Sequence, residues 1–226
     1  MKNRLFLALE LNGVIQAWGG HTLEDTRHSE IHPTRSAILG LLAACLGIPR
    51  TSTSQLEELN KSIVMAVRRN EPWMRQDGKQ VVMTRFVDYH TILGARRVNV
   101  KGNEHNPKHT VQSWREYLAD AHFSVLISLT EESSLSIDDL ERAVKAPLFT
   151  PYLGRKSCPI TTPLYKATLQ ASGFDDAFSQ IPPNRGVIYS EERHSESDNE
   201  LTMRDFPMVG PKRQFDTRKI YFWTER

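Results

Sequence analysis

The feature that most constrains the fold of this chain is residues 37–48, AILGLLAACLGI, a helix-forming segment that is apolar on nearly all sides. Thr34 or Ser36 can cap its start, and Gly47 followed by Pro49 can end it. Since such a helix has almost no face suited to water, other parts of the chain must cover it. The segment is too short to span a bilayer. We therefore expect a cytoplasmic protein with this helix in its core.

We expect the strand-like segments of the sequence to pack against this helix and cover it. They are residues 4–11, 62–69, 80–89 and 123–129, while residues 111–118 fit either a helix or a strand. Asp77-Gly78 indicates a hairpin between 62–69 and 80–89, and residues 119–121 favour another between 111–118 and 123–129. Residues 136–145 are predicted to form a second helix, because Ser136 and Asp139 have the spacing of a capping box.

The order of these segments predicts an α+β fold of the ferredoxin-like or RRM-like type, in which helices cover one face of an antiparallel sheet. We expect this domain to span residues 1–160, with an arm inserted at about residues 90–109 as a long loop or an extended hairpin. Beyond residue 160 the chain becomes more polar, with short strands predicted at Gly186–Tyr189 and Lys219–Trp223. Residues 161–226 are therefore predicted to form a smaller, β-rich lobe packed on the first domain.

Charge is unevenly distributed along the chain. The formal net charge is only +2, but between Thr84 and Glu116 six Arg and Lys residues stand against three Asp and Glu residues, and three His residues lie in the same segment. The segment Glu191–Glu200 is instead acidic. Because affinity for phosphate depends on where positive charge is placed, a local excess of this kind indicates a surface that binds a polyanion.

The arm within this basic segment is the strongest candidate for a binding site. Gly, Asn and Pro residues interrupt it and it has little apolar periodicity, so we expect it to leave the body of the protein. An arm that carries cations, an aromatic ring and amides can follow a sugar-phosphate backbone. The alternative is a solvated basic loop without a binding role. The candidate residues are Tyr89, His90, Arg96, Arg97, Lys101, Lys108 and Gln112.

Three shorter segments also have the chemistry of nucleic-acid contacts. Gln16 and Trp18 stand beside a Gly-Gly pair, where Trp18 either stacks on a base or fills the core. Arg35 and Ser36 lie at a helix start, where free N–H groups and the helix dipole attract anions, although an ordinary capped helix is the commoner case. Arg155 lies in a small glycine-containing loop that either binds an anion or is a solvated turn.

The motifs of common enzymes are missing from the sequence. It contains no GxxxxGK[ST], GxGxxG, GxSxG or HExxH. His28 and His32 are four residues apart, as are His105 and His109, but both pairs lie in loop-like sequence rather than in a predicted helix. The two cysteines lack the spacing of a zinc or redox motif. We therefore expect no metal, no cofactor and no catalytic residue.

Five segments, in a fixed order, resemble one protein family. They are QAWG from Gln16, PTRS from Pro33 with the apolar helix after it, DYHTILGAR from Asp88, VQSWREYLADAHFSV from Val111 and TPYLGRKSCP from Thr150. Together they are similar to the CasD family, the RAMP-type subunit of the type I-E CRISPR Cascade complex. The resemblance runs nearly end to end and weakens at residues 50–80 and 171–200.

The resemblance implies an RRM-like body whose thumb is the arm at about residues 90–109. It implies a non-catalytic subunit that binds and caps the five-prime handle of the CRISPR RNA, while base pairing reads the target. The implied partners are this handle, the backbone subunit and the large PAM-reading subunit of Cascade, and target DNA near the PAM-proximal end, with no membrane partner. The implied role is antiviral defence or another RNA-guided targeting of DNA.

The main alternative is a metal-independent endoribonuclease that processes the CRISPR repeat RNA, as relatives in another subtype do. Such cleavage needs a base, a cation and an acid around one phosphate. His90, Lys101 and Tyr89 could take these roles. The closer resemblance is to the subtype in which a separate endonuclease cuts, which favours the binding subunit.

Overall fold

The structure of the protein is a computed structural model that describes residues 3–23, 25–71, 73–74, 77–93, 110–194, 199–208 and 214–225. For residues 21–23 and 73–74 it describes the backbone alone. The helices are α1 (Arg35–Leu46), α2 (Thr53–Ser62), α3 (Ile137–Lys145) and α4 (Phe174–Ser179). The strands are β1 (Arg4–Asn12), β2 (Ile15–Gln16), β3 (Trp18–Leu23), β4 (Thr26–Glu30), β5 (Ile63–Asn70), β6 (Trp73–Met74), β7 (Gln80–Val81), β8 (Thr84–Leu93), β9 (Thr110–Ala119), β10 (His122–Leu129), β11 (Tyr165–Ala171), β12 (Gly186–Ser190), β13 (Asn199–Met208) and β14 (Gln214–Glu225).

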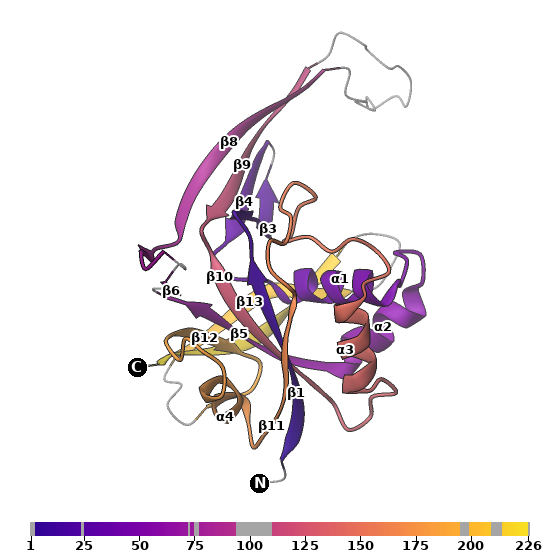
Figure 1. Ribbon diagram of the computed structural model, residues 1–226. Coiled ribbons are helices and arrows are strands. Elements are labelled where there is room, and N and C mark those ends of the chain that lie inside the picture. The colour runs from indigo at the N-terminus through magenta and orange to yellow at the C-terminus, as the bar shows by residue number, and fades with distance from the viewer. Residues whose placement is uncertain are drawn as a thin grey trace.

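Seven of these strands form one sheet in the order β11-β1-β10-β5-β12-β14-β13 (Figure 1). Every neighbouring pair in it is antiparallel. The chain reaches β5 from β1 through α1 and α2, and reaches β11 from β10 through α3. The C-terminal strands β12, β13 and β14 extend this same sheet beyond β5. The boundary predicted after residue 160 therefore does not separate two sheets.

Helices pack on both faces of the sheet (Figure 1). Leu7, Leu9 and Leu11 of β1 point into the larger hydrophobic core, which they share with α1 and α3. Phe6 points to the opposite face and meets Phe174 of α4, with ring centroids 5.2 Å apart. Successive residues of a strand face opposite sides, so a strand buried on both sides is a continuous apolar run. The prediction of helices on one face was wrong in this respect, because α4 covers part of the other face.

The apolar helix and the second helix form where the sequence predicted them. Gly47 ends α1 with φ of 72°, and a Cβ at this position would lie 2.6 Å from the side chain of Leu148. Ser136 caps α3 by accepting a hydrogen bond from the Asp139 N–H at 3.1 Å. No helix within the described ranges combines the length and the apolar character needed to cross a membrane.

A second sheet carries a long hairpin, β8 and β9, that projects from the body (Figure 1). Neither of the two hairpins predicted from turn residues forms between the expected strands, although Asp77-Gly78 does lie between the short antiparallel strands β6 and β7. Strand β5 pairs with β10 and β12 rather than with residues 80–89, and β9 pairs with β8, β2 and β4 rather than with β10. The reason is that residues 80–89 and 111–118, which were predicted as strands of the body, are largely the two strands of the arm. The arm therefore starts at β8, before residue 90.

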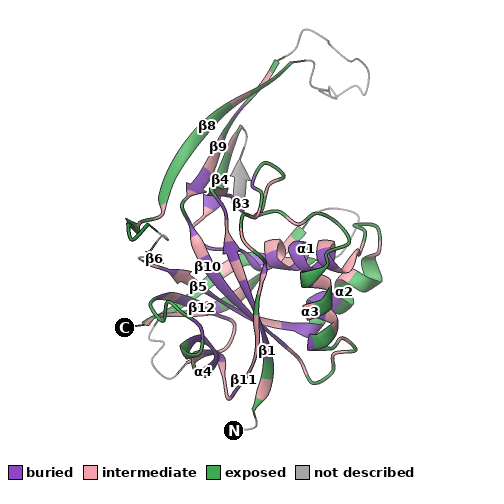
Figure 2. Ribbon diagram, in the orientation of Figure 1, coloured by how far each residue is buried: buried purple, intermediate pink, exposed green. Residues whose placement is uncertain are grey.

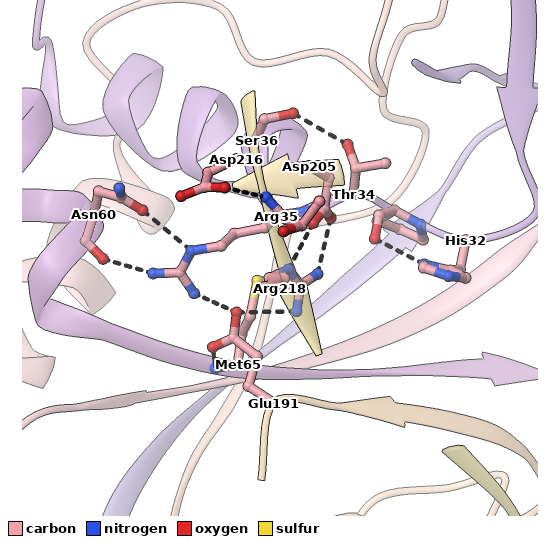
Figure 3. A network of polar contacts seen from close by, with 12 residues as sticks. His32, Thr34, Arg35, Ser36, Asn60, Met65, Glu191, Asp205, Asp216 and Arg218 are labelled. Atoms are coloured by element: carbon pink, nitrogen blue, oxygen red, sulfur yellow. Dashed lines mark hydrogen bonds and ion pairs between the residues drawn. The ribbon is translucent and has the colours of Figure 1, made fainter. Parts of the chain in front are cut away.

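A buried polar network joins the start of α1 to the last two strands (Figure 3). The carboxylate of Glu191 pairs with the guanidinium group of Arg35 and lies 3.1 Å from that of Arg218. Arg218 also donates to both oxygens of Asp205, at 2.6 and 2.8 Å. Burial is the largest single influence and would raise the pKa of Asp205, but the hydrogen bonds and charge of Arg218, together with the hydrogen bond from the Arg35 N–H, hold this pKa below its ordinary value. The network thus keeps its charges paired inside the protein.

We expect Glu191→Ala to destabilise the protein by roughly 3 kcal/mol, because it leaves two largely buried guanidinium groups without their shared carboxylate. Urea denaturation followed by circular dichroism measures this loss. Glu200→Ala is the matched control, since Glu200 pairs with Lys219 in an exposed ion pair, and it should leave the unfolding midpoint nearly unchanged. Equal effects of the two substitutions would contradict the structural role of the network.

Candidate nucleic-acid interface

The β8–β9 hairpin has two different faces, because alternate residues of a strand point to opposite sides. On one face Tyr89 lies directly opposite Trp114, with ring centroids 5.4 Å apart. The exposed fraction is 50% for Tyr89 and 41% for Trp114. Figure 2 shows that β8 is exposed along nearly its whole length. The pair therefore offers aromatic surface to a ligand, on a backbone fixed by the strand ladder.

Gln112 lies on the same face as Trp114, two residues along β9 and opposite Thr91. Its side chain is exposed. Val87 and Leu93 of β8 belong to this face as well and are also exposed. Two rings that can stack and an amide that can donate and accept hydrogen bonds are the groups that single-stranded RNA-binding surfaces use. We call this set, Val87, Tyr89, Leu93, Gln112 and Trp114, the aromatic face.

His90 points to the other face of the hairpin. Its Nε2 lies 2.7 Å from the carboxylate of Asp88, and its strand partner is Ser113. Tyr89 and His90 are consecutive residues of a strand, so their side chains diverge. The arrangement therefore does not bring these two residues around one phosphate, as the endoribonuclease alternative requires.

Arg155 joins the root of the hairpin to the body. Its guanidinium group lies 4.7 Å from the centre of the Tyr117 ring, and Tyr117 stacks on Phe86 with centroids 5.5 Å apart. The same group donates to the carbonyl oxygens of Glu116 and Arg27, at 2.9 and 3.1 Å. These contacts connect β8, β9 and β4, so Arg155 holds the hairpin root together.

A cleft of about 370 Å³ lies beside this root, between α1, the β3–β4 segment and residues 151–155. Ser36 and Arg155, predicted separately from two distant segments, both line it. Arg27 of β4 lines it too, and its guanidinium group has no hydrogen bond or ion pair to any described residue. Tyr152 lines the cleft as well. The cleft thus combines cations, a hydroxyl group and an aromatic ring.

Glu116 lies next to this cleft but its charge is compensated. Its carboxylate accepts hydrogen bonds from the Ser29 N–H at 3.0 Å and from His28 Nδ1 at 3.1 Å, and Arg85 lies 3.7 Å away. Burial favours a higher pKa for Glu116, but these hydrogen bonds hold it below the ordinary value. The carboxylate therefore stays ionised, and two hydrogen-bond donors and the Arg85 cation stabilise its charge.

Gln16 and Trp18 lie in the core rather than on the surface. The exposed fraction is 0% for both. The amide of Gln16 donates to the carbonyl oxygens of Leu11 and Ala121, at 3.3 and 2.7 Å, and Trp18 packs edge-on against Phe123. A ring without exposed surface offers no face to a base. The prediction that these two residues contact RNA is therefore corrected, and the core interpretation of Trp18 holds.

The predicted anion site at the start of α1 is already occupied. The Arg35 N–H donates to the carboxylate of Asp205 at 2.7 Å, so an internal carboxylate takes the place expected for a phosphate. The Arg35 side chain is buried and bonds to Asn60 and Glu191. Arg35 is thus a structural residue and its RNA contact is corrected. Ser36, one residue later, reaches the cleft.

Four predicted residues of the arm, Arg96, Arg97, Lys101 and Lys108, lie outside the described residues, and their role stays a prediction. Sequence reasoning missed three others: Trp114, Arg27 and Tyr152. Trp114 could have been predicted from the sequence, because a strand at 111–118 places it on the same face as Gln112. Arg27 and Tyr152 carry no local signal, since only the fold brings them to one cleft.

No metal site is formed by the part of the chain that the structure describes, where no three His, Cys, Asp or Glu side chains converge. His32 is buried and stacks on Tyr189, and burial lowers its pKa to about 4. His28 bonds to Glu116 instead, while His105 and His109 lie outside the described residues. The two cysteines are buried and unpaired.

An α+β body with an exposed aromatic and amide face on a projecting hairpin, and a cationic cleft at its root, is typical of nucleic-acid-binding scaffolds. Residues 6–221 match the model of the family described as CRISPR-associated protein (Cas_Cas5). The chain is also 46% identical over 220 residues to the CRISPR system Cascade subunit CasD of Escherichia coli strain K12, covering 96% of this chain and 95% of that protein. The chain belongs to the Cas5 family of CRISPR-associated proteins.

The fold is similar to that of chains in several solved structures, among them two that are 25% or more identical in sequence. One is titled CRISPR RNA-guided surveillance complex; a chain in it superimposes with a TM-score of 0.71 and 25% identity, covering 97% of this chain and 90% of that one. The other is titled crystal structure of Cas protein, with a TM-score of 0.64, 26% identity and coverages of 97% and 94%. The similarity extends over nearly the whole chain in both cases.

We expect Arg155→Lys to loosen the hairpin root. A lysine cannot lie flat on Tyr117 and donate to two carbonyls at once, so the loss of stability should be about 1–2 kcal/mol in urea denaturation, with faster amide exchange in β9. Lys156→Ala, at an exposed neighbour, should change neither quantity. If Arg155→Lys matches the wild type in both measurements, Arg155 does not hold the root.

Proposed function

We propose that this chain is a non-catalytic subunit of a Cascade-type, CRISPR RNA-guided surveillance complex, in which it binds and caps the five-prime handle of the guide RNA. The observation that carries the proposal is the aromatic face, which places Tyr89, Trp114 and Gln112 in the open on a projecting hairpin. Membership of the Cas5 family and the likeness to a Cascade subunit support it.

The chemistry of the hairpin suits single-stranded RNA in particular. Bases stack on exposed aromatic rings, each stacked base is worth about 1–3 kcal/mol, and exposed amides can bond base edges. The sequence between the two strands supplies Arg96, Arg97, Lys101 and Lys108, which we propose as phosphate contacts. Stacking on the strands and charge in the connecting segment would together fix the path of the RNA.

The finer fold assignment is also part of the proposal. The helix-connected strands β1, β5, β10 and β11 lie in the order β11-β1-β10-β5, and two helical connections link them. This arrangement supports a ferredoxin-like, RRM-type body of the RAMP kind, with the β8–β9 hairpin as its thumb. The strands β12, β13 and β14 would be an extension of that body.

A binding role is favoured over RNA cleavage. Tyr89 and His90 point to opposite faces of β8, and His90 is paired with Asp88. Neither feature suits a general acid and base acting on one phosphate. We propose further that the subunit contacts the backbone subunit, the large subunit and DNA near the PAM-proximal end, and that it acts in the cytoplasm, where guide RNA is present.

We expect Trp114→Ala and Tyr89→Ala each to weaken binding of repeat-derived RNA by roughly 5- to 150-fold, as the loss of one stacked base predicts. Fluorescence anisotropy with a labelled RNA oligonucleotide measures the affinity. Ile92→Ala is the matched control, because Ile92 is similarly exposed on the opposite face of the same strand. Equal effects of all three substitutions would remove the aromatic face from the RNA interface.

The same preparations separate binding from cleavage. The wild-type chain incubated with repeat RNA in EDTA should return the RNA intact. A cyclic-phosphate product that disappears in His90→Ala would establish the endoribonuclease instead.

The connecting segment gives an independent prediction. We expect the double substitution Arg96→Ala with Arg97→Ala to lower the slope of log affinity against log salt by about 0.7 for each phosphate that the arm no longer neutralises. A salt titration of the same binding assay measures the slope. A slope equal to that of the wild type would exclude both arginines from phosphate binding.

A further inference from the structure

A groove lies between the outer strands of the two larger sheets. Strand β3 ends the second sheet, and β13 ends the seven-stranded sheet. Within the described residues, β3 pairs with β4 alone and β13 pairs with β14 alone. The groove has a volume of about 370 Å³, and its walls come from β3, the end of β4 with the residues after it, and β13. We call it the edge groove.

Strand β13 presents its backbone to the edge groove. All five residues from 201 to 205 line it. Successive residues of a strand point to opposite faces, so a groove over one face would be lined by every second residue. The edge groove therefore runs along the edge of β13, where the N–H and C=O groups that are not bonded to β14 point outward. An extended peptide can add a strand at such an edge.

The wall formed by β3 leaves room for a second backbone. It contains Gly19 and Gly20. A Cβ added to Gly19 would meet no atom within 4 Å, so the packing of the described residues gives no reason for a glycine there. A Cβ added to Gly20 would lie 2.6 Å from Oε1 of Glu30, so this glycine leaves space for that carboxylate. Glycine within a strand often marks a place where another backbone approaches closely.

Glu30 is the charged side chain of the edge groove that the fold leaves without a partner. It is half-buried, and its carboxylate forms no hydrogen bond or ion pair with any described residue. Asp205, which also lines the groove, is bonded to Arg218 at 2.6 and 2.8 Å. Arg204 donates from Nε to the carbonyl oxygen of Phe215 at 3.1 Å. Because an unpaired charge that is partly removed from water is costly, Glu30 favours a cationic ligand.

His32 adds a second hydrogen-bond acceptor. Only 3% of this residue is exposed, and its Nδ1 lies 3.1 Å from the carbonyl oxygen of Pro33, beside the polar network of Figure 3. A carbonyl oxygen only accepts, so Nδ1 carries the hydrogen. Burial lowers the pKa of His32 to about 4, which keeps the ring neutral. Nε2 is then an acceptor, and it has no partner among the described residues.

These groups match a basic side chain on an extended protein segment. A guanidinium or ammonium group can donate to both Glu30 and His32, whereas a phosphate would be repelled by the Glu30 carboxylate. Ile31, Leu201 and Met203 also line the groove and offer apolar surface to the methylene groups of such a side chain. The edge of β13 complements the backbone of a peptide and not that of a nucleic acid.

We propose that the edge groove binds an extended segment of a partner protein, which adds a strand to β13 and places an arginine or lysine side chain against Glu30 and His32. The segment is about five residues long, as the open edge of β13 is. The inference rests on the proposed function in one respect, because the partner is another subunit of the same complex. It does not depend on the RNA contact of the aromatic face.

Glu30→Lys should weaken the assembly of the full chain with the other subunits by about tenfold or more, because it places like charges together in the groove. Glu30→Gln removes the charge alone and should weaken assembly by about fivefold. Biolayer interferometry with the immobilised chain measures both affinities. Neither substitution should shift the unfolding midpoint, since the fold gives Glu30 no partner. Glu57→Lys is the matched control, because Glu57 is exposed on α2, and it should assemble as the wild type does.

Amide hydrogen exchange tests the added strand directly. The amides of residues 201–204 should exchange more slowly in the assembled complex than in the chain alone. The slowing is expected at alternate amides, because the others already bond to β14.

Two results would each overturn the docking site while the proposed function stands: wild-type assembly by Glu30→Lys, or equal exchange of these amides in the chain and the complex. A change in RNA affinity without a change in assembly would make the groove an RNA contact and would also overturn the proposal. If the wild-type chain binds no repeat-derived RNA but its assembly still depends on Glu30, the proposed function fails and the docking site stands. A wild-type chain that does not assemble with these subunits overturns both proposals.

Discussion

The carboxylate of Glu191, held between the guanidinium groups of Arg35 and Arg218, connects parts of the chain that are far apart in sequence. Arg35 begins helix α1, and Arg218 lies in the last strand of the sheet. Removing these charges from water is costly unless each finds a partner, so the network forms only when the C-terminal strands β13 and β14 are in place beside α1. The position of α1, and with it one wall of the cleft, depends on this contact.

The arginine residues show that side chains of the same type can have different surroundings in the fold. Arg35 and Arg155 looked like phosphate ligands in the sequence, yet Arg35 is buried in the network and Arg155 bonds to two carbonyls and a ring. Arg27, which has no local motif around it, lies in the cleft with no partner for its guanidinium group among the described residues. The three arginines therefore differ in the number of partners that the described part of the fold supplies, although their charge is the same.

Rules based on neighbouring residues predicted the helices and strands well, but they predicted poorly which strands pair with one another. The cap at Ser136, the end of α1 at Gly47 and the buried strand from Arg4 follow from side-chain chemistry within a few residues, and all three were predicted. Turn residues at Asp77-Gly78 and Asp120 suggested hairpins between long strands that do not form, because strand pairing is decided by burial across the whole sheet. Asp77-Gly78 lies instead between the short paired strands β6 and β7.

The residues of the candidate site were also predicted only in part. Tyr89 and Gln112 are on one exposed face, as a strand pattern allows, but Gln16 and Trp18 were misplaced because the short segment before the Gly-Gly pair folds into the core. The convergence of Ser36, Arg27 and Tyr152 in one cleft depends on three separate connections of the chain and leaves no trace in local sequence.

The carboxylate that completes the first turn of α1 has a consequence for biosynthesis. Asp205 and its partner Arg218 leave the ribosome long after the helix they stabilise, since the helix lies within the first 46 residues. A nascent chain that ends before β13 lacks the carboxylate of Asp205 that accepts from the Arg35 N–H, and its Glu191 lacks the second arginine, Arg218. The cleft wall therefore acquires its final position late in translation, and a partly made chain lacks the finished shape of that wall.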